Sequence, residues 1–251
     1  MTLVEHLNEL RSRILKAALI TFAAFAISFV FHQYMFDLLI GPYCDLPDRL
    51  RGASDIFNDE RCSLIVTDVP GSLFVTLKAA AVLAVVLAAP PVAYQVWAFV
   101  APGLRANERR YALPFVLLTF LLFAGGAVFA YYVIPRGLEF LLGFGGDNIV
   151  PLLDANEYIG FIFKTMLGFG LSFLAPLAIA MLTLADVLDA DTLRRFRRHT
   201  IFGAFVLAAI ITPTQDPFTM TVMAGPLVLF FEGNIVFARI VERRRGRAVP
   251  A

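Results

Sequence analysis

Hydrophobic residues are gathered along this chain in long blocks that polar residues separate. Four blocks exceed 20 residues, and two blocks near the carboxyl terminus are shorter. The six blocks cover about residues 14–36, 72–100, 111–134, 159–184, 200–212 and 218–237. About 20 apolar residues in a helix cross the hydrocarbon core of a bilayer, and a helix satisfies its own backbone polar groups there. The pattern therefore predicts an all-α integral membrane protein with six transmembrane helices.

The last two blocks are shorter than an ordinary span. The block 200–212 begins after Arg198 and ends at Pro213, and its roughly 13 helical residues reach about 20 Å. The block 218–237 is interrupted by Glu232 and the two residues after it. We expect two short spans across a locally thinned bilayer. A re-entrant hairpin is the alternative.

The composition supports a membrane protein. Of the 251 residues, 59% are hydrophobic and 16% are charged, whereas soluble domains have about 45–50% and about 25%. A soluble fold of this size has too little interior to bury so much apolar surface. This excludes a cytosolic enzyme, a secreted domain and a disordered chain. We expect residues 1–251 to form a single membrane domain.

The distribution of basic residues predicts the orientation. Both terminal segments and every second connection together contain fifteen Lys and Arg, whereas the remaining connections contain four. Because basic residues favour the cytoplasmic side of a membrane, we expect both termini in the cytoplasm. The chain is then a multi-pass protein of the plasma (inner) membrane. Residues 37–71 would form an extracytoplasmic cap loop.

The amino-terminal segment has a helical pattern of its own. Leu3, Leu7, Leu10 and Ile14 recur at spacings of three and four residues, which places them on one helix face. We expect a short amphipathic helix along the inner membrane surface, after which the chain turns into the membrane.

The chain has two cysteines, Cys44 and Cys62, and both fall in the predicted cap loop. The extracytoplasmic compartment permits disulfides. A bridge would close a loop of about 18 residues and stabilise the fold by roughly 3 kcal/mol on the chain-entropy model. We expect this bridge, with two unpaired thiols as the alternative.

Several prolines and charged residues fall inside or beside the predicted spans. The prolines are expected to kink their helices; they are Pro90, Pro91, Pro176 and Pro226. Lys78 and Lys164 are expected to extend toward the outer interface. Glu232 is expected to face the bundle or a wet cavity, or to play a structural role. Asp216 is expected to be a turn or capping residue.

Motifs for several kinds of chemistry are absent from the sequence. There is no phosphate-binding G-x-x-x-x-G-K-[ST] loop and no G-x-S-x-G nucleophile motif. The three histidines, His6, His32 and His199, are far apart, which disfavours a metal site. Topology explains the basic loops without nucleic acid. We therefore expect no enzymatic activity, no cofactor and no nucleic-acid partner, with any energy coming from an ion gradient or a partner.

Two carboxylates on the predicted cytoplasmic face are candidates for ligand binding. They are Glu9 and Glu108. A carboxylate can bind an arginine guanidinium through two parallel hydrogen bonds, which lysine cannot match. These acids could therefore bind an arginine-bearing ligand. Alternatively, Glu9 pairs with Arg13 at i,i+4, and Glu108 pairs with the arginines around it.

Several motifs are spread along the chain. They are His6-Leu7-x-Glu9-Leu10-Arg11, Tyr94-Gln95-Val96-Trp97-Ala98-Phe99-x-Ala101-Pro102-Gly103-Leu104 with Glu108-Arg109-Arg110, Thr67-Asp68, Phe169-Gly170-x-Ser172-Phe173-x-x-Pro176, and Thr212-Pro213 with Asp216-Pro217-Phe218. Together they resemble the motifs of TatC, the six-span core subunit of the twin-arginine protein translocase. The resemblance covers nearly the whole chain.

This resemblance implies a cup-shaped receptor for paired-arginine signal peptides of folded precursor proteins. Single-span partners of the TatA/TatB type would dock on its spans, copies would self-associate in the bilayer, and the proton motive force would drive transport. The implied signal-peptide-binding residues are Glu9, Leu10, Arg11, Glu108, Arg109 and Arg110. The implied partner-binding or structural residues are Asp68, Pro90, Pro91, Pro102, Pro176, Asp216 and Glu232. Many members carry a glutamate where this chain has Leu174.

Two other functions compete with the receptor hypothesis. A secondary transporter of a small solute normally shows internal repeats and broken helices with polar residues near the membrane midplane. The sequence shows no repeat and few such charges. A passive membrane scaffold is the third hypothesis.

Overall fold

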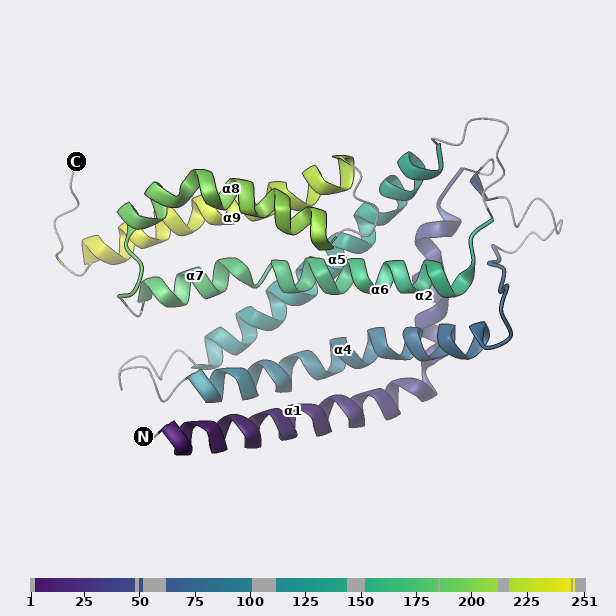
Figure 1. The fold of residues 1–251 in the computed structure, drawn as a ribbon, viewed down its shortest axis with the longest axis horizontal. Coiled ribbons are helices and arrows are strands. Elements are labelled where there is room, and N and C mark those ends of the chain that lie inside the picture. Colours follow the sequence, from purple (N-terminus) through teal and green to yellow (C-terminus); the bar gives the residue numbers. More distant parts are fainter. Residues whose placement is uncertain are drawn as a thin grey trace. The chain divides into compact units, whose positions relative to one another are not determined.

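The computed structural model describes residues 3–47, 50–51, 62–100, 112–143, 152–184, 186–211, 217–244 and 246. Throughout this part of the chain the regular structure is helical, together with one isolated parallel bridge between Ile65 and Asp154. The predicted all-α class is confirmed (Figure 1). The helices are α1 (Leu3–Val30), α2 (His32–Cys44), α4 (Gly71–Val100), α5 (Ala112–Gly143), α6 (Ala155–Ser172), α7 (Ala175–Leu184), α8 (Ala190–Ile211) and α9 (Pro217–Arg244).

Five stretches of the described residues are long and apolar enough to cross a membrane. They are Glu5–Val30, Gly71–Phe99, Pro114–Gly143, Ala155–Leu184 and Thr219–Arg243. The predicted span 200–212 does not qualify, because it is the apolar half of α8, whose other half contains four arginines. The chain therefore has the helices of a multi-pass membrane protein, while a sixth span stays a prediction.

Packing divides the chain into two compact units. Unit 1 comprises Met1–Ala124 with Ile134–Phe163, and unit 2 comprises Gly125–Val133 with Lys164–Ala251. Helices α5 and α6 contribute residues to both units.

The expected separate helix at the amino terminus is wrong. Helix α1 continues without a break from Leu3 to Val30, because this stretch contains neither glycine nor proline. The break comes later, at Phe31, and α2 then continues to Cys44. The first eight residues of the predicted cap loop 37–71 are therefore helical, and the predicted span 14–36 crosses the break.

In unit 1, helix α1 lies along α4 (Figure 1). Three buried alanines, Ala24, Ala84 and Ala88, form the centre of this contact. Small side chains allow two helices to approach closely in a membrane. Helix α4 continues through Pro90 and Pro91 to Val100. The amino-terminal part of α1 thus lies beside the carboxyl-terminal part of α4.

In unit 2, helix α9 packs against α8 and α7. The core at one end of this contact consists of Ala190, Leu193, Phe231, Ile235 and Ala238. Helix α9 continues through the predicted interruption at Glu232, and α8 begins ten residues before the predicted block 200–212. The carboxylate of Asp189 accepts a hydrogen bond of 2.8 Å from the backbone N–H of Thr192, which caps the start of α8.

The predicted span 159–184 consists of two helices. Helix α6 ends at Ser172 and α7 begins at Ala175, with a turn at 173–174. Pro176 has no N–H to donate to the carbonyl four residues earlier, which explains an interruption here. Within unit 2, a Cβ atom on Gly126 of α5 would lie 2.7 Å from the carbonyl oxygen of Phe169, so glycine permits this close approach.

Candidate functional site

The candidate site lies in unit 1, where the amino-terminal part of α1 meets the carboxyl-terminal part of α4. Glu9, Leu10 and Arg11 belong to α1. The ring of His6 on α1 stacks on Phe99 of α4, with centroids 4.6 Å apart. This contact holds the first turns of α1 beside the motif-bearing end of α4.

Glu9 is already bound to a guanidinium. Arg13 donates a hydrogen bond of 3.3 Å from Nη2 to Oε1 of Glu9 and one of 3.2 Å from Nη1 to Oε1 of Gln95. The side chains of Glu9 and Arg13 are 22% and 27% exposed. We call these three residues the Glu9–Arg13–Gln95 cluster. It brings a half-buried carboxylate, an arginine and an amide together from two helices.

The structure brings together only part of the predicted signal-peptide-binding set. Leu10 is half-buried and Arg11 is exposed on α1, next to Glu9. The other predicted members, Glu108, Arg109 and Arg110, lie outside the described residues, as does the predicted structural residue Pro102. Trp97 lies near the end of α4, shortly before these undescribed residues. It is buried, and its ring stacks on Phe115 of α5 with centroids 5.0 Å apart. This stacking fixes the end of α4 from which the undescribed segment leads.

The opposite end of unit 1 contains a carboxylate that the sequence analysis missed. Asp154 Oδ2 accepts hydrogen bonds from the backbone N–H and hydroxyl of Thr67, at 2.9 and 2.7 Å. Its Oδ1 accepts from the backbone N–H groups of Asn156 and Glu157 at the start of α6. The signal was the sequence Asp-x-x-Glu, which is typical of a helix amino terminus.

These hydrogen bonds favour the charged form of Asp154. The hydroxyl of Thr67 is the largest cause that lowers the pKa of Asp154 below its ordinary value of 3.8, partial burial opposes it, and the backbone N–H groups lower it further. Asp68, the predicted structural residue beside Thr67, is exposed. A Cβ atom on Gly71 would lie 2.5 Å from the Asp68 carboxylate, so glycine leaves room for this side chain where α4 begins.

Lys78 on α4 reaches the beginning of α6. Its Nζ donates to the backbone carbonyl of Asn156 at 2.9 Å and also to the side-chain oxygen of Asn156. A Cβ atom on Gly160 would lie 3.1 Å from this Nζ, so glycine leaves room for the ammonium group. Lys78 thus fastens α4 to α6. Lys164, in unit 2, is exposed.

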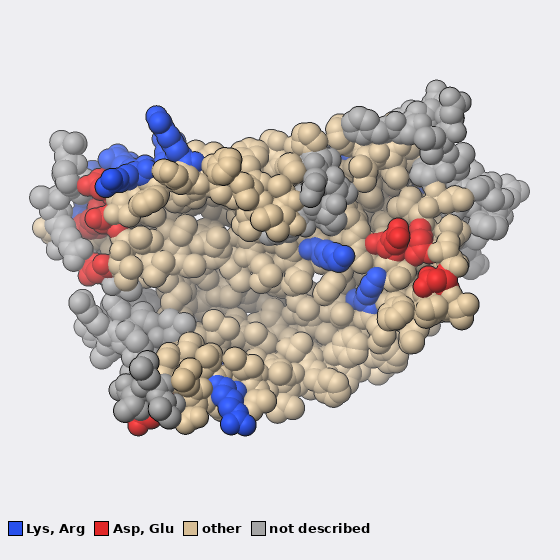
Figure 2. Space-filling view, in the orientation of Figure 1, with Lys and Arg blue, Asp and Glu red and all other residues tan. Residues whose placement is uncertain are grey.

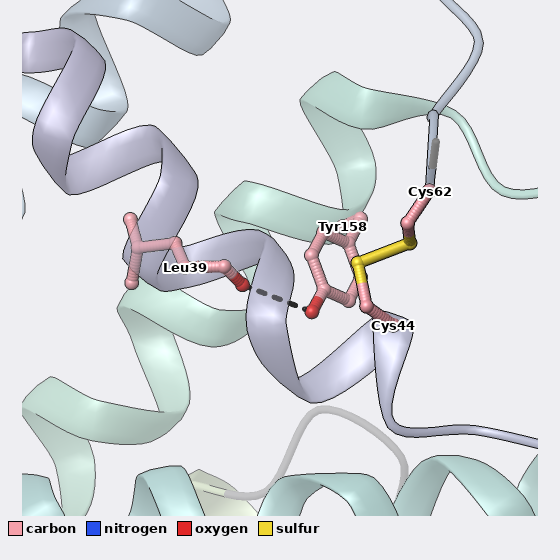
Figure 3. The surroundings of a disulfide bond; sticks show 4 residues. All are labelled: Leu39, Cys44, Cys62 and Tyr158. Carbon is pink, nitrogen blue, oxygen red and sulfur yellow. Dashed lines mark hydrogen bonds between the residues drawn. A yellow bond between two sulfur atoms is a disulfide. The ribbon is translucent and has the colours of Figure 1, made fainter. Parts of the chain in front are cut away.

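A disulfide joins Cys44, at the end of α2, to Cys62, with their Cα atoms 5.6 Å apart. Figure 3 shows the ring of Tyr158 beside this bond, with its hydroxyl directed at the α2 backbone. That hydroxyl donates a hydrogen bond of 3.0 Å to the carbonyl of Leu39. Leu39 and Tyr43 are completely buried. The bridge therefore lies beside a packed contact between α2 and α6.

In unit 2, polar side chains of α9 contact other segments. Glu232 accepts a hydrogen bond of 2.5 Å from Nε of Arg197 on α8. Asn234 donates to the carbonyl of Pro176 at 3.0 Å, and Glu242 accepts from the backbone N–H of Ala190 at 2.8 Å. Glu232 thus has a structural contact, the second of its expected roles. Asp216 lies outside the described residues.

Basic side chains gather over the amino-terminal part of α8 (Figure 2). Arg194, Arg195, Arg197 and Arg198 are all exposed there. Farther along the helix, Phe202 and Ile210 are exposed apolar residues, at 71% and 75%. Within the described ranges, no group of three or more His, Cys, Asp or Glu side chains is placed to hold a metal ion.

Comparison with models of known protein families identifies the family of this chain. The family model described as Sec-independent protein translocase protein (TatC) matches residues 5–226. The chain belongs to the TatC family. It is therefore a component of a protein translocase, that is, a transport protein, and its family supports a role in twin-arginine translocation.

Individual TatC proteins are similar over almost the whole chain. The TatC protein of Frankia casuarinae is 42% identical over 98% of this chain and 68% of its own length. That of Corynebacterium kroppenstedtii is 35% identical over 99% of this chain and 64% of its own length. The chain thus spans about two thirds of the length of these two relatives. A crystal structure of the twin arginine translocase receptor TatC is 33% identical, with a TM-score of 0.77, and the match covers 94% of this chain and 98% of that one.

Proposed function

We propose that this chain is the core receptor subunit of a twin-arginine translocase. It binds the paired arginines of signal peptides on folded precursors at the cytoplasmic face, with Glu9 as one of the binding carboxylates. The observation that carries this proposal is the half-buried Glu9 carboxylate, which already accepts a hydrogen bond from a guanidinium. Its similarity to a solved TatC that is named a receptor supports the same role.

The other proposed binding residues belong to the motif Glu108-Arg109-Arg110, which follows α4 in the sequence, and to the segment of α1 around Glu9. Glu108 is proposed as the second carboxylate, with Arg109 and Arg110 beside it. Leu10 and Arg11 flank Glu9 on α1, where they would contact residues around the arginine pair. Two carboxylates match two guanidinium groups in charge, and guanidinium geometry explains why lysine would bind more weakly.

The proposed topology has six spans, with both termini in the cytoplasm of the inner membrane. The excess of basic residues on one set of connections supports this orientation. The disulfide between Cys44 and Cys62 supports an extracytoplasmic position for residues 37–71, because disulfides persist in oxidising compartments. The chain would form one membrane domain, cup-shaped, with short fifth and sixth spans.

The proposed partners are single-span TatA/TatB-type subunits and further copies of this chain. Translocation would be driven by the proton motive force. Exposed apolar side chains on α8 and α9 support docking of other membrane helices; they include Phe202, Ile210 and Leu229. Structural roles are proposed for Asp68, Pro90, Pro91, Pro102, Pro176, Asp216 and Glu232.

Photocrosslinking in membranes tests the receptor assignment. A photoreactive residue replaces Ser12, which is exposed and lies three positions after Glu9 on α1. A matched probe replaces Val69, which is 99% exposed before the start of α4. The precursor carries either Arg-Arg or Lys-Lys in its signal peptide.

The Ser12 probe should crosslink the Arg-Arg precursor, and the crosslink should be lost with Lys-Lys and with Glu9→Gln. The Val69 probe should give no signal-dependent crosslink. Equal crosslinking of both precursors, or crosslinking that survives Glu9→Gln, would contradict the receptor assignment.

A further inference from the structure

The Glu9–Arg13–Gln95 cluster contains both halves of the proposed recognition. Glu9 is the carboxylate proposed to bind an arginine, and Arg13 is an arginine already bound to it. We propose that Arg13 is an internal competitor for Glu9, so that a signal-peptide arginine must displace Arg13 to bind. This inference rests on the proposed function and adds regulation of the same site.

The competition is between identical chemical groups. Arg13 uses Nη2 to donate to Oε1 of Glu9 at 3.3 Å. A ligand guanidinium needs the same carboxylate for two parallel hydrogen bonds. Because Arg13 occupies one of the two oxygens, a ligand can complete its bidentate contact when the Nη2 bond has broken.

The helix fixes the competitor close to its target. Glu9 and Arg13 are four residues apart on α1, and residues at this spacing are neighbours on a helix surface. The internal arginine is therefore present at a high effective concentration that does not depend on the protein concentration. Precursor binding has to overcome this competition at every encounter.

Gln95 explains how Arg13 can be displaced without disturbing the fold. It accepts the second Arg13 hydrogen bond, from Nη1 at 3.2 Å, and it belongs to α4. When the bond to Glu9 breaks, the guanidinium keeps its hydrogen bond to the half-buried Gln95 on α4. The α1–α4 contact at Ala24, Ala84 and Ala88 is not involved, so the exchange needs only side-chain movement.

The expected size of the competition is modest. Ion pairs with this degree of exposure contribute weakly, so removing the competitor should strengthen ligand binding about two- to fivefold. Simple competition lowers the affinity of every ligand by the same factor. Arg-Arg and Lys-Lys peptides should therefore gain equally, and their affinity ratio should stay constant.

Equilibrium binding of fluorescent signal peptides to the purified full-length protein in lipid nanodiscs tests the inference. Arg13→Gln removes the competing guanidinium, and Arg13→Lys keeps the charge while losing the two-nitrogen fork. Lys16→Gln is the matched control, because it removes one positive charge from an exposed position of the same helix. Thermal unfolding of each variant is measured alongside.

Arg13→Gln should raise the affinity for both peptides two- to fivefold, Arg13→Lys should give a smaller rise, and Lys16→Gln should give none. A loss of binding in a folded Arg13→Gln protein would overturn the inference, because Arg13 would then support binding. So would no change, or an equal rise in Lys16→Gln. If Glu9→Gln binds like the original chain, the proposed function fails; if Glu9→Gln loses binding while Arg13→Gln gains none, only the competition fails.

Discussion

Two arginine–glutamate pairs, one in each unit, use the same groups in different ways. Glu9 and Arg13 lie on one helix and are 22% and 27% exposed. Glu232 and Arg197 lie on different helices, 35 residues apart, and are 36% and 57% exposed. The first pair can open while α1 stays in place, whereas opening the second removes a contact between α8 and α9.

The surroundings of the two pairs sharpen this difference. Arg13 has an amide partner on α4, Gln95, in addition to Glu9. Around Glu232, the other polar side chains of α9 also contact neighbouring segments, through Asn234 and Glu242. The contacts of the Glu9–Arg13 pair thus leave room for exchange with a ligand, as proposed, whereas those of the Glu232–Arg197 pair connect two helices. The residue types alone do not distinguish a pair that can exchange with a ligand from a pair that connects two helices.

The largest expected effect is a difference in signal-peptide affinity between substitutions of Glu9 and of Glu232. Glu9→Gln should weaken binding of an Arg-Arg signal peptide about 10- to 100-fold, because hydrogen bonds to charged groups contribute roughly 1.5–3 kcal/mol. Glu232→Gln is the same chemical change in unit 2 and should leave binding unchanged. Titration of a fluorescent peptide into both variants in nanodiscs measures this. Similar losses in the two variants would mean that Glu9 has no special role.

The next effect concerns the free energy of unfolding of unit 2. Asn234 is 7% exposed, and Asn234→Leu would remove its hydrogen bond to the Pro176 carbonyl, which should cost about 1–2 kcal/mol. Glu232→Gln should cost under about 1 kcal/mol, because that pair is exposed to solvent. Detergent-denaturation curves followed by circular dichroism compare the variants. A larger loss from Glu232→Gln would show that the ion pair, and not the buried amide, fastens α9.

The smallest expected effect concerns Asp154, whose carboxylate accepts hydrogen bonds from Thr67 and from the start of α6. The Thr67 hydroxyl lowers the pKa of Asp154 in the folded protein. The folded state therefore favours the charged form of this carboxylate. The stability contributed by Asp154 is fully present above its ordinary pKa of 3.8 and is lost as the pH falls through the lower folded value. Unfolding measured from pH 5 downward should show this loss below about pH 4. Asp154→Asn should remove that part of the pH dependence, and an unchanged profile would contradict the assignment.

The apolar blocks predicted most of the helices because membrane helices must be long and hydrophobic. The prediction failed where a helix extends beyond its apolar block. Helix α8 extends into a charged segment that Asp189 caps, and α1 includes an amphipathic segment expected to be separate. Hydropathy does not record such continuations, since arginine and glutamate are good helix formers.

The candidate site was predictable in part. The i,i+4 spacing of Glu9 and Arg13 indicated their pairing, which the sequence analysis retained as the alternative to ligand binding. The contribution of Gln95 was not predictable, because it lies 82 residues away on another helix. The Thr67–Asp154 contact, over 87 residues, was missed for the same reason. Long-range polar contacts depend on helix packing, which one sequence does not report.

The disulfide between Cys44 and Cys62 also carries information about the history of each molecule. Thiols facing the cytoplasm stay reduced, whereas those reaching an oxidising compartment can be joined. The bond closes a loop across an 18-residue separation, between the end of α2 and the segment that precedes α4. On the proposed topology, a bridged chain is one in which this segment has already reached an oxidising environment. The ratio of bridged to thiol-bearing chains in newly made protein would then measure how far membrane insertion has proceeded.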